Sequence, residues 1–256
     1  MAHAYFHGRS SQRRWGGNVD DYLNIHSFFD STKAYLPDAR HRLVLHNYVG
    51  ISLAEHIFHQ PQAKTIYGAI INADGKEVTI LDIGQQHVIE DFGHIPAVAD
   101  VVLLLSKSLP PRLANFNMQR VDEFLHEKLG GTVEDYEAFK NFFSFYSDIG
   151  ENKAGYALLC NAFGLFMCEK YLGVTWVRPS DSRLMPTRYV AEKLVKLGYG
   201  NLIPTLQDIL RDIKVEKWMF ENAAALDAQF QDAAPDHSSF ENPIVTETFK
   251  QLQLPL

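Results

Sequence analysis

The sequence predicts a mainly α-helical protein in which two tandem helical units are related by internal duplication, and so by a pseudo-two-fold relationship. The first observation is a repeat: the segment Gly16–Glu55 returns without a gap as Gly130–Glu169, 114 residues later. The second is that apolar residues recur at helical spacing through most of the chain. The third is that a clear alternating, strand-like pattern is confined to one short stretch around Ala73-Asp74-Gly75.

The repeat exceeds what composition alone produces. Between Gly16 and Phe58, eleven paired positions are identical, where chance would give about two or three. The turn Phe92–Pro96 corresponds to Tyr199–Pro204 in the second copy, which is one residue longer. Kept glycines and prolines suit a backbone role, because they form turns that other residues form only at a cost. A unit of about 110 residues is domain-sized and too long for a solenoid repeat.

Three parts of the chain follow from this repeat. We expect a first unit over residues 1–112, a second and degenerate unit over 116–215, and a C-terminal helical extension over 216–256. The segment Leu109-Pro110-Pro111 is typical of a linker. Paired units of this kind predict an intramolecular pseudo-dimer, so the chain is expected to be a monomer or a homodimer.

The first unit begins with a predicted helix that Asn18 or Asp20 caps and that runs to about Lys33. Pro37-Asp38 opens a second helix, near 38–59, because apolar residues recur there every third or fourth position.

A small β-hairpin is expected over 65–81, since Asp-Gly between two alternating runs favours a tight turn. Helices follow near 82–91 and 96–107, separated by the turn at 92–95. The first unit is therefore helical with one hairpin.

The second unit should repeat this order with less strand. Thr175-Trp176-Val177 and the loop at 179–182 stand where the hairpin would be, so we expect the hairpin to be reduced. The extension is expected to place Trp218, Met219 and Phe220 on an apolar face of the second unit. The helices of the second unit and of the extension are predicted near 117–129, 133–147, 152–172, 187–197, 204–214 and 216–231, with a loop at 232–242 and a short segment at 243–253.

Composition limits the functional classes. The chain has 256 residues, is 46% hydrophobic and 21% charged, and carries a net charge of −7. This charge argues against a general nucleic-acid-binding surface, which is normally basic. Cys160 and Cys168 form no metal or redox motif. No stretch of 18 apolar residues and no signal-peptide core occur, so we expect no membrane span and a cytoplasmic protein.

Histidines are distributed unequally between the two units. The chain has 11, and nine of them lie in the first 94 residues. Residues that the fold requires should be kept in both copies, so polar residues lost from the second copy are candidates for function. The replaced pairs are His26 and Lys140, His41 and Gly155, His46 and Cys160, His56 and Lys170, His87 and Leu194, Asp30 and Ser144, and Asp91 and Gly198.

Residues and motifs spread over about 100 positions of the first unit form a recognisable pattern. They are Trp15-Gly16-Gly17, Asp21-Tyr22, Ile25-His26, Phe29-Asp30-x-x-Lys33, Arg40-His41-Arg42, His46, Gly50, Glu55, Ile57-Phe58, Gly84-Gln85-Gln86-His87-Val88 and Glu90-Asp91-Phe92-Gly93-His94-Ile95-Pro96. In these positions the first unit resembles a family of short bacterial and phage proteins that are known only as a domain of unknown function. The resemblance implies no activity.

One hypothesis makes the first unit a metal-dependent hydrolase that acts on a phosphate ester or nucleotide. Imidazole and carboxylate ligands suit Zn²⁺, Mn²⁺ or Fe²⁺. The expected metal ligands are His26, His41, His46, His87 and Asp91, with Asp30 or Asp38 as further candidates.

His87 and Asp91 would also supply acid/base catalysis in this hypothesis. Arg40 and Arg42 would hold a phosphate group, and Lys33 would add a point charge. Several helices that contribute His and Asp would resemble an HD-type phosphohydrolase by analogy alone. Against this, the repeat has no adjacent His-Asp pair. His41 and His46 are also about 140° apart on the single predicted helix, so they should not share a face.

The alternative hypothesis is a non-enzymatic binding or interaction module, such as a bacterial or phage accessory protein with a protein partner. The histidines would then be structural or would make interface contacts. His46, on the apolar stripe of its helix, would be a hydrogen-bonded core residue. No nucleophile elbow, phosphate-binding P-loop or dinucleotide fingerprint occurs in the sequence to favour another enzyme class.

Overall fold

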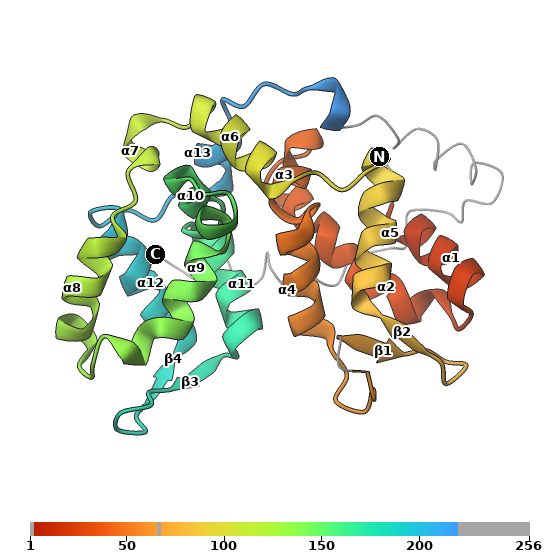
Figure 1. The fold of residues 1–256 in the computed structure, drawn as a ribbon, viewed down its shortest axis with the longest axis horizontal. Coiled ribbons are helices and arrows are strands. Elements are labelled where there is room, and N and C mark those ends of the chain that lie inside the picture. The colour runs from red at the N-terminus through yellow and green to blue at the C-terminus, as the bar shows by residue number, and fades with distance from the viewer. Residues whose placement is uncertain (1–2, 66–67, 220–256) are drawn as a thin grey trace. The chain divides into compact units, whose positions relative to one another are not determined.

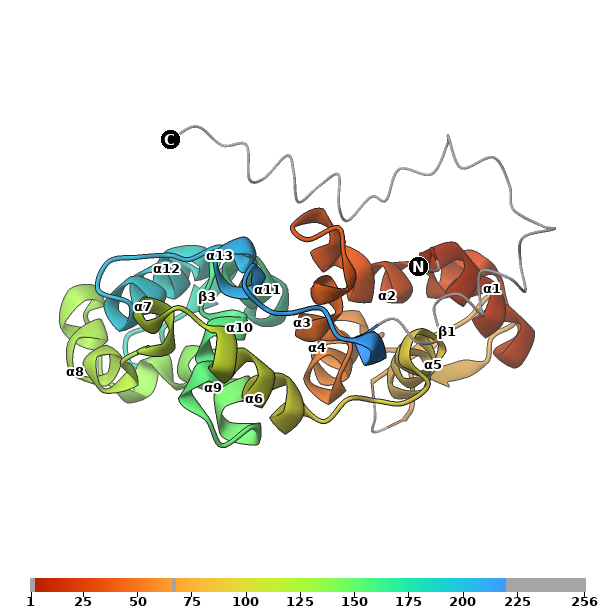
Figure 2. The same cartoon turned by 90° about the horizontal axis from the view of Figure 1, so that it is seen from above.

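The structure is a computed structural model that describes residues 3–65 and 68–219, and it shows a mainly helical chain with two small antiparallel hairpins (Figures 1 and 2). None of the helices in this described part has the length and apolar character needed to cross a membrane. The predicted fold class, mainly α with two tandem units, is confirmed. The predicted segments beyond Met219 lie outside the described residues.

The first repeat contains a cluster of four helices, a hairpin and two further helices. Helices α1, α2, α4 and α5 pack on one another (Figure 1). The elements are α1 (Ala4–Trp15), α2 (Val19–Asp30), α3 (Arg42–Leu45), α4 (Tyr48–Phe58), β1 (Ala69–Ile71), β2 (Glu77–Thr79), α5 (Ile80–Phe92) and α6 (Val98–Ser108), with 3₁₀ turns at Ser31–Ala34 and Ala39–His41.

The second repeat follows the same order after a short connecting helix. Its helices α8, α9, α11 and α12 correspond to α1, α2, α4 and α5. The elements are α7 (Pro111–Ala114), α8 (Met118–Leu129), α9 (Glu137–Ile149), α10 (Tyr156–Leu159), α11 (Ala162–Leu172), β3 (Thr175–Val177), β4 (Leu184–Pro186), α12 (Thr187–Gly198) and α13 (Leu206–Leu210), with 3₁₀ turns at Glu134–Tyr136, Lys153–Gly155 and Lys217–Met219.

The chain crosses twice between two compact units. The described residues up to Pro96, together with those from Val215 onward, form the first unit, and Ala97–Lys214 form the second. Helix α6 therefore packs within the second unit, against α9 and the turn at Lys153–Gly155, although the sequence repeat places it in the first copy. The boundaries predicted at 112 and 116 follow the repeat in the sequence and stay a prediction.

The single helix predicted near 38–59 is wrong, because the chain breaks at His46 and Asn47. The Asn47 side chain accepts from the Gly50 amide and donates to the carbonyl of Leu43, so it closes one helix and starts the next. A Cβ on Gly50 would lie 1.8 Å from the Leu45 carbonyl oxygen, which is why only glycine fits.

The second unit breaks in the same place for the same reason, so the continuous helix predicted over 152–172 is also wrong. Asn161 accepts from the Gly164 amide and donates to the carbonyl of Ala157. A Cβ on Gly164 would lie 1.6 Å from the Leu159 carbonyl oxygen. This break turns the side chain before each asparagine, His46 or Cys160, into the interior of its unit.

The Gly-Gly turns are also held alike in the two units. The Tyr22 hydroxyl donates to the Gly16 carbonyl at 2.8 Å, and the Tyr136 hydroxyl donates to the Gly130 carbonyl at 2.6 Å. Asp21 completes the first turn by accepting from the Asn18 amide. Residues that both copies keep therefore fix the backbone.

One further expectation was wrong, and one helix was not predicted. The second hairpin is not reduced, because β3 pairs with β4 over three residue pairs, as β1 does with β2. Helix α1 was not expected before residue 18, although its counterpart near 117–129 was.

Trp218 and Met219 were expected on the second unit but pack within the first, while Phe220 lies outside the described residues. The Trp218 ring packs on Phe92, with centroids 5.7 Å apart, and the Met219 carbonyl accepts from Arg42. Both partners belong to the first unit, so this segment completes the first unit instead.

Candidate metal centre

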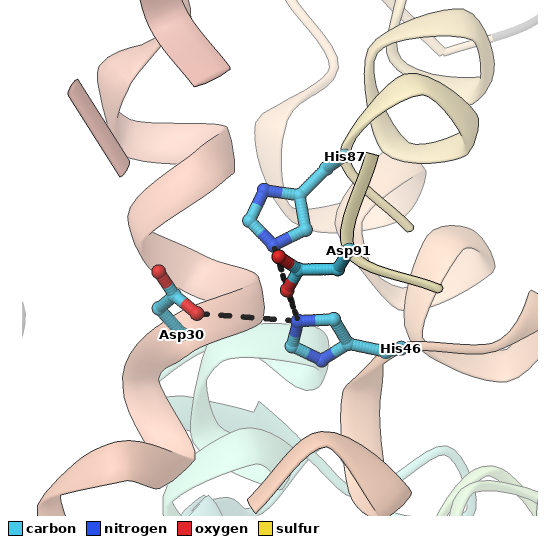
Figure 3. Close-up of side chains that lie close together, drawn as sticks. All are labelled: Asp30, His46, His87 and Asp91. Atoms are coloured by element: carbon cyan, nitrogen blue, oxygen red, sulfur yellow. Dashed lines mark hydrogen bonds and ion pairs between the residues drawn. The ribbon is translucent and has the colours of Figure 1, made fainter. Parts of the chain in front are cut away.

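Four chemically suited side chains converge in the interior of the first unit. Asp30, His46, His87 and Asp91 each offer one donor atom, and these atoms all lie within 4.8 Å of one another (Figure 3). All four side chains are buried, at 4% exposure or less. Within residues 3–65 and 68–219 this is the one group of at least three such residues that could hold a metal ion.

The fold brings these residues together from three places. Asp30 is the last residue of α2, His46 stands at the break before α4, and His87 and Asp91 lie on α5. Residues four apart on a helix lie on the same face, so His87 and Asp91 point the same way. The break at His46, which the kept Asn47 and Gly50 impose, thus helps to build the site.

The distances suit a shared cation. His46 Nε2 lies 3.1 Å from His87 Nε2, 3.1 Å from Asp91 Oδ2 and 3.9 Å from Asp30 Oδ1. His87 Nε2 lies 3.8 Å from Asp91 Oδ2. Ligands at about 2.1 Å from a tetrahedral metal are about 3.4 Å from one another. The four donor atoms therefore surround a space of the right size.

The charges on the group also suit a cation. Burial raises the pKa of Asp30, but the neighbouring Lys33 ammonium and other contacts lower it well below its usual range. Burial likewise raises the pKa of Asp91, but the hydrogen bond with His46 and the nearby His7 ring hold it well below its usual range. Burial lowers the pKa of His46 to about 4. Ionised carboxylates and neutral imidazoles are the protonation states in which these groups bind metals.

The tautomer of His87 follows from a chain of buried hydrogen bonds. The Glu90 carboxylate can only accept, so the Gln86 amide nitrogen faces it, and the Gln86 oxygen accepts from the Ser11 hydroxyl. Ser11 then accepts from His26 Nε2, at 2.8 Å. Burial and the charge of His7 lower the pKa of His26 well below its usual value, so the ring is neutral. Its Nδ1 must therefore accept.

This chain of hydrogen bonds ends at the candidate metal centre. His87 Nδ1 lies 3.1 Å from His26 Nδ1 and is the donor of that hydrogen bond. Burial and the charge of His7 also lower the pKa of His87 well below its usual value, so its ring is neutral too. The unprotonated nitrogen of His87 is thus Nε2, which faces His46 and Asp91. An outer shell that fixes a histidine tautomer in this way is typical of metal sites.

His7 is part of this environment, although sequence reasoning assigned it no role. Its Nδ1 lies 2.7 Å from Glu90 Oε2 and its ring packs on that of His87, with centroids 4.1 Å apart. Burial lowers the pKa of His7, but the nearby carboxylates of Asp91 and Glu90 raise it to about 9, so His7 is a buried cation. The 114-residue offset, carried back into α1, pairs His7 with Val121 and would have found it.

The other predicted ligands lie beside the group. His41 Nε2 is 3.8 Å from Asp30 Oδ1 and has no hydrogen-bond partner in the described residues, while its Nδ1 faces the Asp38 carbonyl. His26 is not a member of the group, because its two nitrogens face Ser11 and His87. The Asp38 carboxylate pairs with Arg40, away from the group.

The expectation that His41 and His46 do not share a face was wrong. It assumed one helix, but His41 ends a 3₁₀ turn and His46 follows α3. Their ring centroids are 5.7 Å apart, and both face Asp30.

The predicted phosphate-binding cations each pair with a carboxylate. Arg42 is fully buried and its Nη2 lies 2.9 Å from Asp91 Oδ1. Lys33 Nζ lies 2.7 Å from Asp30 Oδ1 and is partly exposed. Arg40 contacts both oxygens of Asp38. Of the three, Arg42 and Lys33 contact the candidate ligands directly.

Comparisons with known proteins give a family and no activity. No curated protein and no solved structure matches the chain. One family model matches it twice, over residues 2–108 and 123–219, in agreement with the internal repeat. The chain belongs to the family described as Domain of unknown function (DUF6915), of which it carries two copies in tandem.

Proposed function

We propose that the first unit holds a catalytic divalent metal centre and that the protein is a metal-dependent hydrolase of phosphate esters or nucleotides. One observation carries the proposal: two carboxylates and two imidazoles bring one donor atom each to within 4.8 Å of one another in a buried interior. Burying charged and polar groups is costly unless a partner compensates them. Arg42 and Lys33 each pair with one of the two carboxylates, and a divalent cation would be a shared partner for all four groups.

Zn²⁺, Mn²⁺ and Fe²⁺ are the candidate ions, because mixed imidazole and carboxylate sets suit all three. Asp30, His46, His87 and Asp91 are the proposed ligands. His41 is a candidate for a further ligand, since its Nε2 has no hydrogen-bond partner among the described residues and faces Asp30.

The surrounding residues have supporting roles in this proposal. When bound, the metal would polarise a phosphoryl oxygen and lower the pKa of a water. Arg42 holds Asp91 in place, and the chain through His26 keeps the Nε2 lone pair of His87 directed at the centre. Lys33, which is partly exposed and contacts Asp30, is the nearest candidate to meet a phosphate group, whereas Arg40 would have to leave Asp38 to do so.

Metal analysis of protein purified without a histidine tag tests the centre. We expect one metal ion per chain in the natural protein and none in Asp30→Ser or His87→Leu. These changes install the residues of the second unit, Ser144 and Leu194, so the helices should tolerate them. The matched control Leu194→Ala alters the second unit at the equivalent position and should keep the metal. A metal-free natural protein that ignores added Zn²⁺, Mn²⁺ and Fe²⁺ contradicts the proposal.

Hydrolysis of bis(4-nitrophenyl) phosphate by the metal-loaded protein tests the reaction class. We expect turnover that chelation abolishes and that His87→Leu lowers at least 100-fold, while Leu194→Ala leaves it unchanged. Metal binding without any turnover of phosphate esters would support the proposed metal centre but contradict the proposed hydrolase activity.

A binding or interaction module is the second candidate, and the direct contact between His46 and Asp91 favours it. His46 Nε2 can also donate to Asp91 Oδ2 at 3.1 Å, which would satisfy both groups without a metal. The histidines would then form a structural hydrogen-bond network. This reading predicts stable protein without metal and equal melting temperatures with and without added metal ions.

A further inference from the structure

The second unit contains a basic pocket that is separate from the candidate metal centre. It has a volume of about 340 Å³. Four of its seven lining residues are cations, in a chain whose net charge is −7. The lining residues are Arg120, Lys128, Lys193, Lys196, Leu197, Gly200 and Asn201.

Two packed helices and one turn form the pocket. Arg120 and Lys128 lie on α8, and Lys193 and Lys196 lie on α12, three residues apart and so on one face. The turn after α12 closes the pocket at Asn201, whose φ of +82° is unusual for a residue other than glycine. The Asn201 amide donates to the Lys196 carbonyl at 2.6 Å, which holds this turn against the helix end.

The cations of the pocket are poorly compensated. Among the described residues, Lys196 has one ion pair, at 3.8 Å from Glu192, and the other three cations have none within 4.0 Å. Lys193 Nζ lies over the Tyr189 ring, 5.4 Å from its centroid. Like charges gathered around a hollow repel one another. An anion in the hollow would remove that repulsion.

The fold does not require this charge. The first unit has Phe6 where α8 has Arg120, and Gln86 and Ile89 where α12 has Lys193 and Lys196. Of the four cations only Lys128 has a basic counterpart, Arg14. Three of the four positive charges are thus specific to the second unit.

We propose that this pocket binds a small molecule that carries a phosphate or diphosphate group. Its volume lies in the range of small-ligand pockets, which is roughly 300–1,000 Å³. Arginine and lysine bind phosphate oxygens through charge-assisted hydrogen bonds. The small extent of the basic area and the acidic chain around it disfavour a nucleic-acid polymer, which needs an extended basic surface. The site is independent of the proposed metal centre.

Calorimetric titration of the full chain with inorganic pyrophosphate at low salt tests this site. EDTA is included so that the first unit holds no metal that could bind the probe. We expect one site per chain, with binding about tenfold weaker in Lys193→Gln and in Arg120→Gln, because a hydrogen bond to a charged group is lost. Binding should also weaken as salt is added. Lys214→Gln, an exposed lysine of the same unit outside the pocket, is the matched control and should bind normally.

Several results overturn the proposal. These are absence of binding to the natural chain, unchanged binding in both pocket variants, or an equal loss in Lys214→Gln. Binding that disappears in Asp30→Ser would place the anion in the first unit instead. Displacement of pyrophosphate by a short single-stranded DNA at lower phosphate concentration would make the pocket part of a nucleic-acid surface. Circular dichroism of each variant establishes that a loss of binding is not a loss of fold.

Discussion

The two units share a backbone frame but fill it with different interiors. In the first unit, His7, His46 and His87 lie around Asp91, and in the second, Val121, Cys160 and Leu194 occupy the corresponding positions. Buried Arg42 corresponds to Tyr156. An apolar interior therefore suffices for this fold. The polar interior of the first unit is not a folding requirement, and it costs stability unless something compensates it.

The largest expected effect tests the shared frame. Gly50→Ala and Gly164→Ala should each destabilise their unit by about 4 kcal/mol or more, because each new Cβ overlaps a backbone carbonyl. Urea unfolding followed by circular dichroism measures this. Gly75→Ala is a milder control, since a Cβ there meets nothing within 4 Å, although its positive φ carries some strain. A large effect in only one unit would show that the frames are not equivalent.

The second-largest expected effect is stabilisation by a metal ion, which should occur in the first unit and not in the second. If metal binds only the first unit, a saturating ion at about 100 times its Kd stabilises that unit by about 3 kcal/mol. Chelation should then lower the Tm of its unfolding transition by roughly 5 °C or more, as calorimetry would measure. Asp30→Ser should melt at the same temperature with and without chelator. A chelation effect that persists in Asp30→Ser would place the metal elsewhere.

A smaller effect tests the chain of hydrogen bonds that fixes His87. Ser11→Ala removes the acceptor for His26 Nε2, so metal affinity should fall about 10–100-fold while the ligands stay in place. Competition with a fluorescent chelator measures the affinity. Leu125→Ala alters the equivalent position of α8 and should leave metal affinity unchanged. Equal affinity of Ser11→Ala and the natural chain would contradict the assigned tautomer.

The smallest expected effect tests the ion pair between Arg178 and Asp181, next to the second Gly-Gly turn (Gly130-Gly131). A hydrogen bond from Arg178, which also donates to the Leu129 carbonyl, lowers the pKa of Asp181 to about 2. A carboxyl group with a lowered pKa stabilises the fold above its unfolded pKa of about 3.9, and this contribution is lost as the pH falls toward 2.

Asp181→Asn should therefore unfold with a weaker pH dependence between pH 4 and pH 2. The effect is small because Asp181 is exposed. An acid-unfolding curve identical to that of the natural chain would mean that the pair contributes nothing.

The sequence predicted the repeat, the fold class and most members of the candidate metal centre. It could do so because the two copies of a duplicated unit can be compared with each other. It did not predict the break at Asn47, since apolar spacing continues across the break and hides it. His7 was not predicted because it lies in α1, before Gly16, where the clear repeat begins. Asp30 was only a secondary candidate, and its role depends on where α2 ends. The contacts of Arg42 with Asp91 and Met219 join distant parts of the chain, which periodicity cannot report.

The return of Val215–Met219 to the first unit has a consequence for biosynthesis. Arg42 donates to the Met219 carbonyl, so the first unit lacks one of its buried hydrogen bonds until that residue has left the ribosome. At ordinary rates of synthesis, the stretch from Pro96 to Met219 takes on the order of ten seconds. During that interval the buried guanidinium beside Asp91 is incompletely paired. The copy that begins to fold first is therefore the copy that is completed last, after the second unit has been made.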